Sequence, residues 1–447
     1  MKNKIYSERE AEFSATLKKL LVTTKSDFGL IKDIGRVLQY YDEPKPWQYS
    51  ASIDSKFLNQ KGRSFDSAAS GISFFSEKYA LLKCLSEAIE RYCNFSFFKS
   101  SDKIISTFKV LKNDAIDPIS IVGFSKNQLK SDALKKFRIN NNSVFSWTQG
   151  KSLTTNQNIL IPSQLIYLSY PFLKDEPSIY PSISTGCAGG ECLSAALVRG
   201  ICEIIERDAF MIFYLNKLPA TKIQLELIDD SRIKALLNTF KRYCMEVYSF
   251  DLTTDITVPT FLSIVINRTG IGKSVSIGMK CGLDSTSALV GSIEETFTSR
   301  TWLRTEFESH PGKVSASDLL KKSDIKTRGF LWYPKSAIKK LDFLLNSQKR
   351  TSQLPLSRIN KTSGEQLEIL VSLLSKLGLE IIYKNITAPI FKKLNFFVAK
   401  VIIPKAQPFY LNESKKLLGG ERLYKVPGKL GFKTSNSKLN NFPHPFL

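Results

Sequence analysis

Histidine is almost absent from this chain of 447 residues, since only His310 and His444 occur. A Ser-His or Cys-His catalytic dyad would have to use one of these two residues, so we do not expect one. Cysteine is also sparse, with seven residues and no C-x-x-C pair. Cys187 and Cys192 could contribute to a zinc site, but reduced, mostly buried thiols are the better interpretation.

Long apolar runs are missing as well. No stretch approaches the roughly 18 residues that span a bilayer, and the longest are short pieces such as FLSIVI. The first residues, MKNKIYSEREAEF, lack the apolar centre of a signal peptide. We therefore expect a cytoplasmic protein that does not bind membranes.

Negative charge is in short supply, because 64 Lys and Arg face 41 Asp and Glu and leave a net charge of +23. Clustered basic residues would indicate nucleic-acid binding. Here they are dispersed, as in LKKFRIN and SAIKKLD, without a zinc finger, an RNP signature or a continuous basic helix. No nucleic-acid partner is expected, although the positive charge could help to attract an acidic peptide.

The chain also lacks a phosphate-binding P-loop. NRTGIGKSVSIG contains Gly272, Lys273 and Ser274 in the order of that loop. The required glycine five positions before Gly272 is Asn267, and alternating SVSIGM follows where a helix should begin. Strand, turn and strand is the simpler prediction for this segment.

Composition and pattern are those of a large globular α/β protein. With 43% hydrophobic residues and no low-complexity tract, the chain can bury one elaborate domain or two to three simpler ones. Helix-like GEQLEILVSLLSKLG is followed by strand-like EIIYKNI and FFVAKVII, an alternation that predicts sheets packed with helices. A lysine-rich stretch near residues 312–365 is interpreted as a connecting insertion.

One charge pattern occurs twice. CEIIERDAF and LSEAIERYCNF both carry E-x-x-E-R in helix-like surroundings. Two glutamates three apart on a helix repel each other by a few tenths of a kcal/mol unless a cation lies between them. Four convergent carboxylates with two arginines would form a site for magnesium on a polyphosphate, with carboxylates on the metal and guanidiniums on phosphate oxygens. These residues are Glu87, Glu90, Arg91, Glu203, Glu206 and Arg207.

A glycine-rich stretch, SISTGCAGGECLSAALVRG, leads directly into the second of these helices. Glycines 186, 189 and 190 before a helix would let backbone N–H groups approach an anion. Beside the duplicated E-x-x-E-R, this stretch indicates nucleotide binding. A third acidic pair, Glu294 and Glu295, lies in helix-like ALVGSIEETFTSR.

These motifs together resemble the YcaO family. STGCAGGECLSAALVRGICEIIERDAF is similar to that family's signature, and KGRSFDSAASGISFFSEKYALLKCLSEAIERY is similar to its other nucleotide-binding segment. The resemblance extends through DFGLIKDIG, ALVGSIEETFTSR and NFFVAKVIIPKAQPF to the terminal PHPFL, and so covers about residues 25–447. It is strongest to the SagD-like, or D-protein, branch of azoline-forming cyclodehydratases in thiazole/oxazole-modified peptide (bacteriocin) biosynthesis.

The resemblance implies a fold, a reaction and a set of site residues. The fold is α/β (α+β), with an internal pseudo-repeat and sheets packed with helices around an ATP site. The reaction uses ATP and Mg²⁺ to convert Cys, Ser or Thr of a ribosomal precursor peptide into thiazoline or oxazoline rings through phosphorylation of the peptide amide oxygen. Glu87, Glu90, Glu203 and Glu206 would hold the metal. The residues that would bind the nucleotide are these four with Lys61, Arg91, Ser184, Gly186, Arg207 and Glu295. The proline-rich tail, with Pro443, Pro445 and Leu447, would reach the active site as a catalytic element.

Several positions depart from the family pattern, namely Lys83, Thr185, Ala195, Gly291, Thr298 and Leu447. Two alternatives to azoline formation therefore stay open. One is backbone thioamide formation with a sulfur donor, which the PHPFL tail disfavours. The other is a non-catalytic scaffold within a peptide-modifying complex, which Lys83, Ala195 and Gly291 motivate.

The predicted organisation is a small N-terminal segment, residues 1–55, before a YcaO domain over residues 56–447. The segment is too short for the leader-binding, E1-like module that fused relatives carry. We therefore expect a precursor peptide with a leader and a separate E1-like partner protein that binds this leader. A flavin dehydrogenase in the same complex and a homodimer are further partners that the resemblance leaves open.

Overall fold

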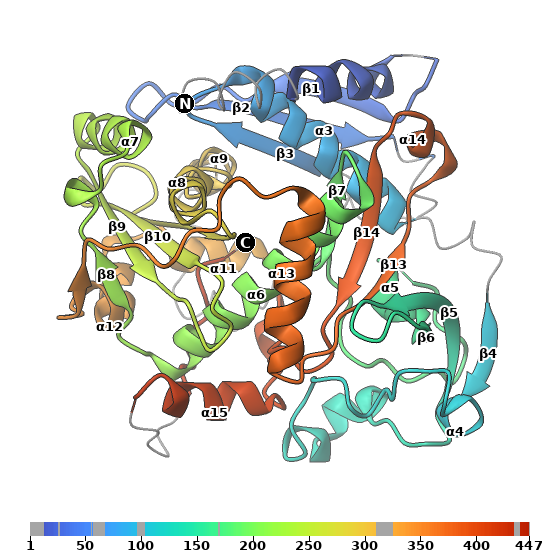
Figure 1. Ribbon diagram of the computed structural model, residues 1–447. Helices are drawn as coiled ribbons and strands as arrows, with labels where there is room; N and C mark the ends of the chain where they lie inside the picture. Colours follow the sequence, from blue (N-terminus) through green and yellow to red (C-terminus); the bar gives the residue numbers. More distant parts are fainter. Residues whose placement is uncertain are drawn as a thin grey trace.

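The computed structural model describes residues 13–25, 27–54, 56, 68–95, 103–168, 170–309, 325–432 and 439–446. Three β-sheets with helices packed between and around them form the described part of the chain (Figure 1). The mixed α/β fold expected from the sequence is confirmed. Lys61, His310 and Leu447 lie outside the described residues.

The first sheet is antiparallel and consists of β1 (Ile31–Arg36), β2 (Trp47–Ile53) and β3 (Ala68–Ser73). Helix α3 (Glu77–Asn94) covers it and begins at Ser76, whose side chain accepts a hydrogen bond from the backbone N–H of Tyr79. Gly71 lets β3 approach this helix closely, because a Cβ there would lie 2.1 Å from the carbonyl oxygen of Ala80. The boundary expected near residue 55 falls between two neighbouring strands of this sheet.

The second sheet has the order β4-β5-β13-β14-β7, with β6 paired to β5. Its strands are β4 (Ile104–Thr107), β5 (Val144–Ser152), β6 (Asn158–Pro162), β7 (Cys187–Gly190), β13 (Ile382–Asn385) and β14 (Phe397–Ile402). Helix α13 (Ser363–Lys376) packs nearby and opens with a capping box between Thr362 and Glu365. The helix and the two strands predicted from residues 364–403 are therefore confirmed.

The third sheet has the order β11-β10-β9-β8-β12. Its strands are β8 (Thr221–Ile223), β9 (Met245–Asp251), β10 (Thr260–Asn267), β11 (Val275–Cys281) and β12 (Arg350–Thr351). The helices near it are α7 (Ser231–Arg242), α8 (Ser285–Glu295) and α9 (Arg300–Glu308). Strands β10 and β11 pair antiparallel around the GIGKS turn, so the strand-turn-strand prediction is confirmed.

The expected insertion near residues 312–365 is partly wrong. Residues 325–345 fold into α11 (Ile325–Leu331), a 3₁₀ helix (Lys335–Leu341) and α12 (Asp342–Leu345). Phe330 and Trp332 are buried in the core beside the third sheet, so these residues stabilise the domain rather than merely connect its parts. This structural role could not be recognised from the sequence, because the many lysines lie on the exposed side of short helices.

Helix α6 (Leu193–Asn216) runs through the centre of the molecule (Figure 1). It contacts β7 and β14 of the second sheet, β10 and β11 of the third, and the helices α13 and α15 (Glu421–Lys429). A helix that is apolar on all sides belongs inside a protein, and most of α6 is buried. Its few charged residues therefore need partners within the fold.

A strand-helix unit occurs three times. Strands β3, β7 and β11 each form an edge of their sheet, and each is followed directly by a helix that carries glutamates, namely α3, α6 and α8. The sequence predicts an internal repeat from two copies, and the third copy emerges only in the fold. Within the described ranges, no helix is long and apolar enough to span a membrane.

Candidate functional site

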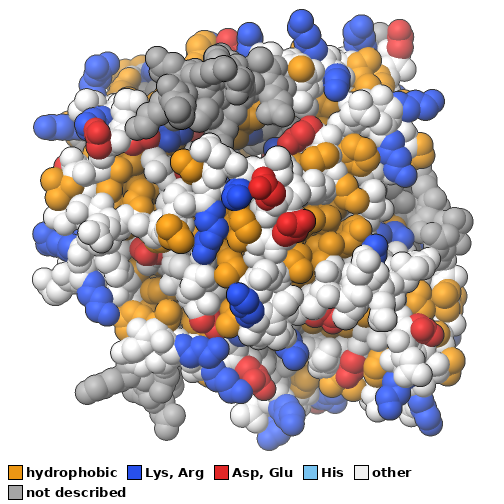
Figure 2. All heavy atoms as spheres, in the orientation of Figure 1, with side chains coloured by type: hydrophobic (Ala, Val, Ile, Leu, Met, Phe, Trp, Pro, Cys, Tyr) orange, Lys and Arg blue, Asp and Glu red, His pale blue; other side chains and the backbone are white. Residues whose placement is uncertain are grey.

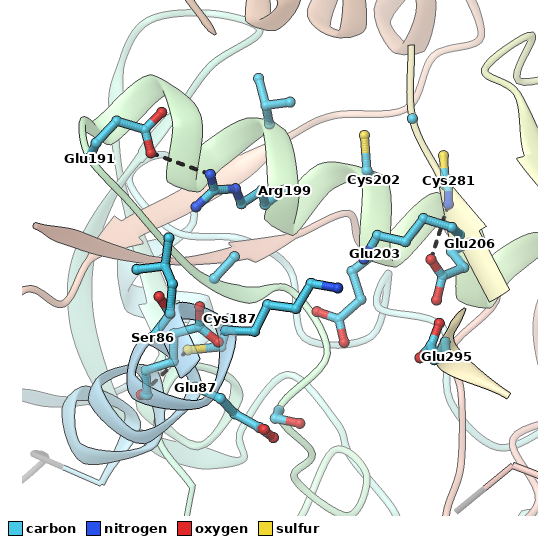
Figure 3. A pocket seen from close by; sticks show the side chains of 18 of the residues that line it. Ser86, Glu87, Cys187, Glu191, Arg199, Cys202, Glu203, Glu206, Cys281 and Glu295 are labelled. Carbon is cyan, nitrogen blue, oxygen red and sulfur yellow. Dashed lines mark hydrogen bonds and ion pairs between the residues drawn. The ribbon is translucent and has the colours of Figure 1, made fainter. Parts of the chain in front are cut away.

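A cavity of about 490 Å³ lies where the three strand-helix units meet (Figure 3). Eight of the residues expected at the nucleotide site line it, namely Glu87, Glu90, Arg91, Ser184, Glu203, Glu206, Arg207 and Glu295. The two E-x-x-E-R segments therefore face one space, as their duplication suggests.

Each helix directs one glutamate back to the strand of its own unit. The backbone N–H of Ser70 donates to Glu87 (2.7 Å), that of Gly186, just before β7, to Glu203 (3.0 Å), and that of Met279 to Glu295 (3.1 Å). The partners are 17, 17 and 16 residues apart in sequence. These N–H groups belong to sheet edges that would otherwise be unpaired.

Each helix also directs a second glutamate to the next unit. The backbone N–H of Gly189 donates to Glu90 (2.7 Å), that of Cys281 to Glu206 (3.1 Å), and that of Phe74, directly after β3, to Glu294 (2.7 Å). The three units are thereby joined in a closed ring of carboxylate-to-backbone hydrogen bonds. The Cys281–Glu206 bond is visible as a dashed line in Figure 3.

The glycine-rich segment does not form the expected loop. Cys187–Gly190 is strand β7, paired antiparallel to β14. The N–H groups of Gly186 and Gly189 do approach anions, but these anions are the carboxylates of Glu203 and Glu90. Gly186 is required because its φ is +83° and a Cβ would lie 2.4 Å from the carbonyl oxygen of Val401.

Two ring carboxyls are strongly perturbed. Burial, with the neighbouring Glu87 and Glu203 carboxylates, raises the pKa of Glu90 to about 8. Burial, together with Glu295, raises the pKa of Glu206 to about 7, although Lys280 and Arg207 oppose that rise. Burial is the largest cause in both cases, so a bound cation beside these carboxyls would stabilise their ionised forms.

The arginines of the two E-x-x-E-R segments contact their own glutamates. Arg91 lies 2.8 Å from an oxygen of Glu87. Arg207 is looser, with 3.8 Å to Glu203 and 3.9 Å to Glu206, and its Nε makes no hydrogen bond within the described residues. An incompletely paired guanidinium beside carboxylates can donate to a phosphate oxygen.

Sequence reasoning missed three cations of the site. Lys400 is buried and donates to the carbonyl oxygens of Ile183 (2.9 Å) and Thr185 (2.7 Å), which fixes the segment that carries Ser184. Arg199 and Lys280 line the cavity. The only signal was local: Lys280 and Lys400 are each the one charged residue of their strand, and Arg199 lies four residues before Glu203 on α6.

The described part of the C-terminal tail, residues 439–446, packs beside the site. Phe446 is buried, and its ring centroid lies 4.9 Å from that of Phe210 and 5.5 Å from the guanidinium carbon of Arg207. The carbonyl oxygen of Pro443 accepts hydrogen bonds from Trp332 (3.0 Å) and Tyr214 (3.1 Å). Pro445 is buried in the same tail.

The described part of the site offers no activated protein nucleophile. Burial raises the pKa values of the Cys187 and Cys281 thiols well above their usual range, so their reactive thiolates are disfavoured. His444 is fully buried and its Nε2 lies 2.8 Å from the carbonyl oxygen of Tyr410. Burial, followed by the charge of Arg328, lowers the pKa of His444 well below its usual value.

The donor set fits magnesium carried on a nucleotide. One oxygen each of Glu90, Glu203 and Glu206 accepts no hydrogen bond from any described residue and is available to a metal. No three acidic, Cys or His side chains in the described ranges are grouped closely enough to hold an ion together. Mg²⁺ needs no such cage, because it binds through one or two carboxylates together with phosphates and water.

Fold and site define an α/β protein in which paired glutamates surround a nucleotide-sized cavity. A family model described as YcaO cyclodehydratase, ATP- and Mg²⁺-binding, matches residues 74–407. The chain therefore belongs to the YcaO cyclodehydratase family.

Two curated relatives match part of the chain. An uncharacterized protein of Methanothermobacter thermautotrophicus is 26% identical over 223 residues, or 49% of this chain and 54% of the relative. An uncharacterized protein in the tfuA 3′ region of Rhizobium leguminosarum bv. trifolii is 28% identical over 123 residues, or 27% and 29%. The chain thus matches about half or less of the length of these relatives.

Solved structures share the fold. A heterocyclase in complex with substrate and cofactor aligns with a TM-score of 0.78 at 22% identity, covering 96% of this chain and 57% of its own. YcaO from Methanopyrus kandleri, bound with AMPPCP and Mg²⁺, aligns at 0.65 and 15% identity, covering 92% and 95%. A chain of the E. coli microcin synthetase McbBCD complex with pro-MccB17 bound aligns at 0.58 and 14%, covering 83% and 87%.

Proposed function

We propose that this enzyme converts Cys, Ser or Thr residues of a ribosomally made precursor peptide into thiazoline or oxazoline rings. The observation that carries the proposal is the cavity wall, where glutamates from three helices meet without an activated nucleophile among the described residues. Phosphoryl transfer asks a protein mainly for positioning and charge stabilisation, and this wall can supply both.

The proposed reaction takes its nucleophile from the peptide. The substrate side chain attacks the preceding amide carbon, and the carbonyl oxygen takes the terminal phosphoryl group of ATP, so that ADP leaves. Loss of phosphate and of the side-chain and amide protons then closes the C=N bond of the azoline. Bound Mg²⁺ would offset phosphate charge.

Different residues of this chain would bind magnesium and phosphate. Glu90, Glu203 and Glu206 would hold magnesium through their remaining oxygens, while Arg91 and Arg207 would bind phosphate oxygens. Ser184 and Glu87 lie in the same wall and would complete the contacts. The tail would keep Arg207 in place, since Phe446 packs beside its guanidinium.

Mass spectrometry of the treated peptide tests the proposal. The purified enzyme is incubated with its precursor peptide, the leader-binding partner and Mg-ATP. Loss of one water per modified residue supports azoline formation. Replacement of oxygen by sulfur would instead establish thioamide formation, and an unchanged mass would favour a scaffold. The Glu203→Gln variant should leave the peptide unmodified in every case.

The separate leader-binding partner is part of the same proposal. The related fold in the E. coli microcin synthetase McbBCD complex supports an assembly of this kind. Precursor capture by this chain alone should be weak and should improve when the partner is added. Full capture without any second protein would contradict this part of the proposal.

A further inference from the structure

Lys280 occupies a distinctive position, because it is the only charged residue of β11. The backbone N–H groups on either side of it, those of Met279 and Cys281, donate to Glu295 and Glu206 at 3.1 Å each. The strand therefore fixes the backbone of Lys280 between two ring carboxylates. Its side chain is exposed to the cavity rather than packed in the core.

A second cavity of about 860 Å³ adjoins the first. Residues of α8 line it, as do Arg358 and Ile359 from the segment before α13. Five charged residues, Lys83, Glu87, Arg199, Lys280 and Glu295, line both cavities and so mark their common border, together with several neutral neighbours. A group that passes from one cavity to the other has to cross this border.

Two of the three cations at the border are already engaged. Lys83 donates to the carbonyl oxygen of Ile72 at 2.8 Å, and Arg199 donates to that of Gly189 at 2.6 Å. The ammonium of Lys280 donates no hydrogen bond to any described residue, although Glu206 and Glu295 surround it with negative charge. Lys280 is therefore the border cation that is free to bind an incoming anion.

Gly291 on α8 provides the room that Lys280 needs. A Cβ at this position would lie 3.3 Å from Cγ and 3.6 Å from Cδ of Lys280. The lysine stem thus runs across the space in which a side chain of residue 291 would begin. The cation at the border therefore comes from β11, and the missing side chain of Gly291 on α8 leaves the space that it occupies.

We infer that Lys280 binds the terminal phosphate of the nucleotide, the group that crosses from the first cavity to an acceptor in the second. The inference rests on the proposed function and adds a phosphate-binding residue to it. An ammonium offers three donors and a compact charge, which suits phosphate oxygens. Lys280 stays protonated throughout: the bond from the terminal phosphorus to the ADP oxygen breaks, and the bond from phosphorus to the acceptor oxygen forms.

Nucleotide binding to the purified chain tests this role. Calorimetry compares AMPPCP with ADP, both with Mg²⁺, for the wild type, Lys280→Met and Lys280→Arg. Loss of one charged hydrogen bond should weaken AMPPCP binding roughly tenfold or more in Lys280→Met while ADP binding stays unchanged. Lys280→Arg should recover part of the loss. Equal weakening of both nucleotides, or of neither, would overturn the assignment.

Relocation of the cation separates phosphate binding from a purely structural role. In Lys280→Ala combined with Gly291→Lys, an ammonium reaches the same border from α8. This double variant should prefer AMPPCP over ADP more strongly than Lys280→Ala does, at a similar melting temperature. Absence of any recovery in the folded double variant would contradict the inference. If the wild type itself bound no AMPPCP, the proposed function would fail, whereas wild-type binding with an unaltered Lys280→Met would remove only the role of Lys280.

Discussion

The backbone N–H of Gly189 donates a 2.7 Å hydrogen bond to Oε1 of Glu90, although the two residues are 99 positions apart in sequence. This bond ties the second strand-helix unit to the helix of the first. Its counterparts, from Cys281 to Glu206 and from Phe74 to Glu294, close the ring. Glu90 and Glu206, two of the carboxylates that would bind magnesium, therefore also join neighbouring units, so site and fold depend on each other.

Glu203 should be essential for nucleotide binding. Glu203→Gln keeps an acceptor for the N–H of Gly186 but removes the charge that would offset magnesium, so the variant should fold and lose Mg-AMPPCP binding. Glu191→Gln is the matched control, because Glu191 lies at the cavity rim and pairs with Arg199 outside the ring. Calorimetry of both variants checks this. Equal binding by Glu203→Gln and wild type would contradict the metal assignment.

The stability of the nucleotide-free protein should fall as pH rises from about 5 to 7. Glu90 and Glu206 keep protons in the folded state up to pKa values of about 8 and about 7, whereas the unfolded chain loses them near 4.5. The folded state then binds more protons, which makes the pH slope of the unfolding free energy negative. Urea unfolding at several pH values measures this slope.

Glu90→Gln supplies the control for that pH dependence. The variant cannot ionise at position 90, so its stability should decline less steeply than that of the wild type over the same range. Parallel slopes for the two proteins would show that Glu90 ionises normally in the folded state.

Asp208 should be important for stability rather than for chemistry. It is fully buried, and Arg422 on α15 donates to both of its oxygens at 2.8 Å. Asp208→Ala removes one of the two carboxylates that bind Arg422, the other being Asp255, and leaves the buried N–H of Gln407 without its acceptor. It should therefore cost roughly 2 kcal/mol or more in unfolding free energy. Glu421→Ala, which breaks the exposed pair with Lys425 on the same helix, should leave the unfolding free energy nearly unchanged. Similar losses in both variants would refute this distinction.

The tail should influence the site through Phe446. Phe446→Ala removes a buried ring beside Arg207 and should lower the unfolding free energy by about 3 kcal/mol. It should also weaken Mg-AMPPCP binding, because Arg207 loses its packing partner. Phe442→Ala is the control, since Phe442 packs on Trp332 instead, with ring centroids 5.2 Å apart. Denaturation and calorimetry should show destabilisation in both variants and weaker binding only in Phe446→Ala.

The sequence was informative where chemistry is local. The two E-x-x-E-R segments, the β10–β11 hairpin and the α13–β13–β14 run could be predicted because periodicity and turn residues specify them. Dispersed Lys and Arg also fit the structure, since on the face shown in Figure 2 basic side chains are scattered rather than gathered in a stripe.

Features that depend on contacts between residues far apart in sequence could not be predicted. Cys187–Gly190 is a strand because β14 pairs with it, and no local pattern indicates that partner. Glu294 turns from the cavity to Ser73 and Phe74, 221 and 220 residues away, while its neighbour Glu295 faces the site. The proposed role of Lys280 could not be predicted either, because it depends on the space that Gly291 on α8 leaves for the lysine side chain.

The most direct test of the central idea, that both E-x-x-E-R segments build one metal-nucleotide site, is a crystal structure with Mn²⁺ and AMPPCP. Anomalous scattering from manganese locates the ion without reference to the protein density. We expect manganese between α3 and α6, held by phosphate oxygens and by at least one glutamate from each helix. Manganese bound to only one of these helices, or to neither, would contradict the account.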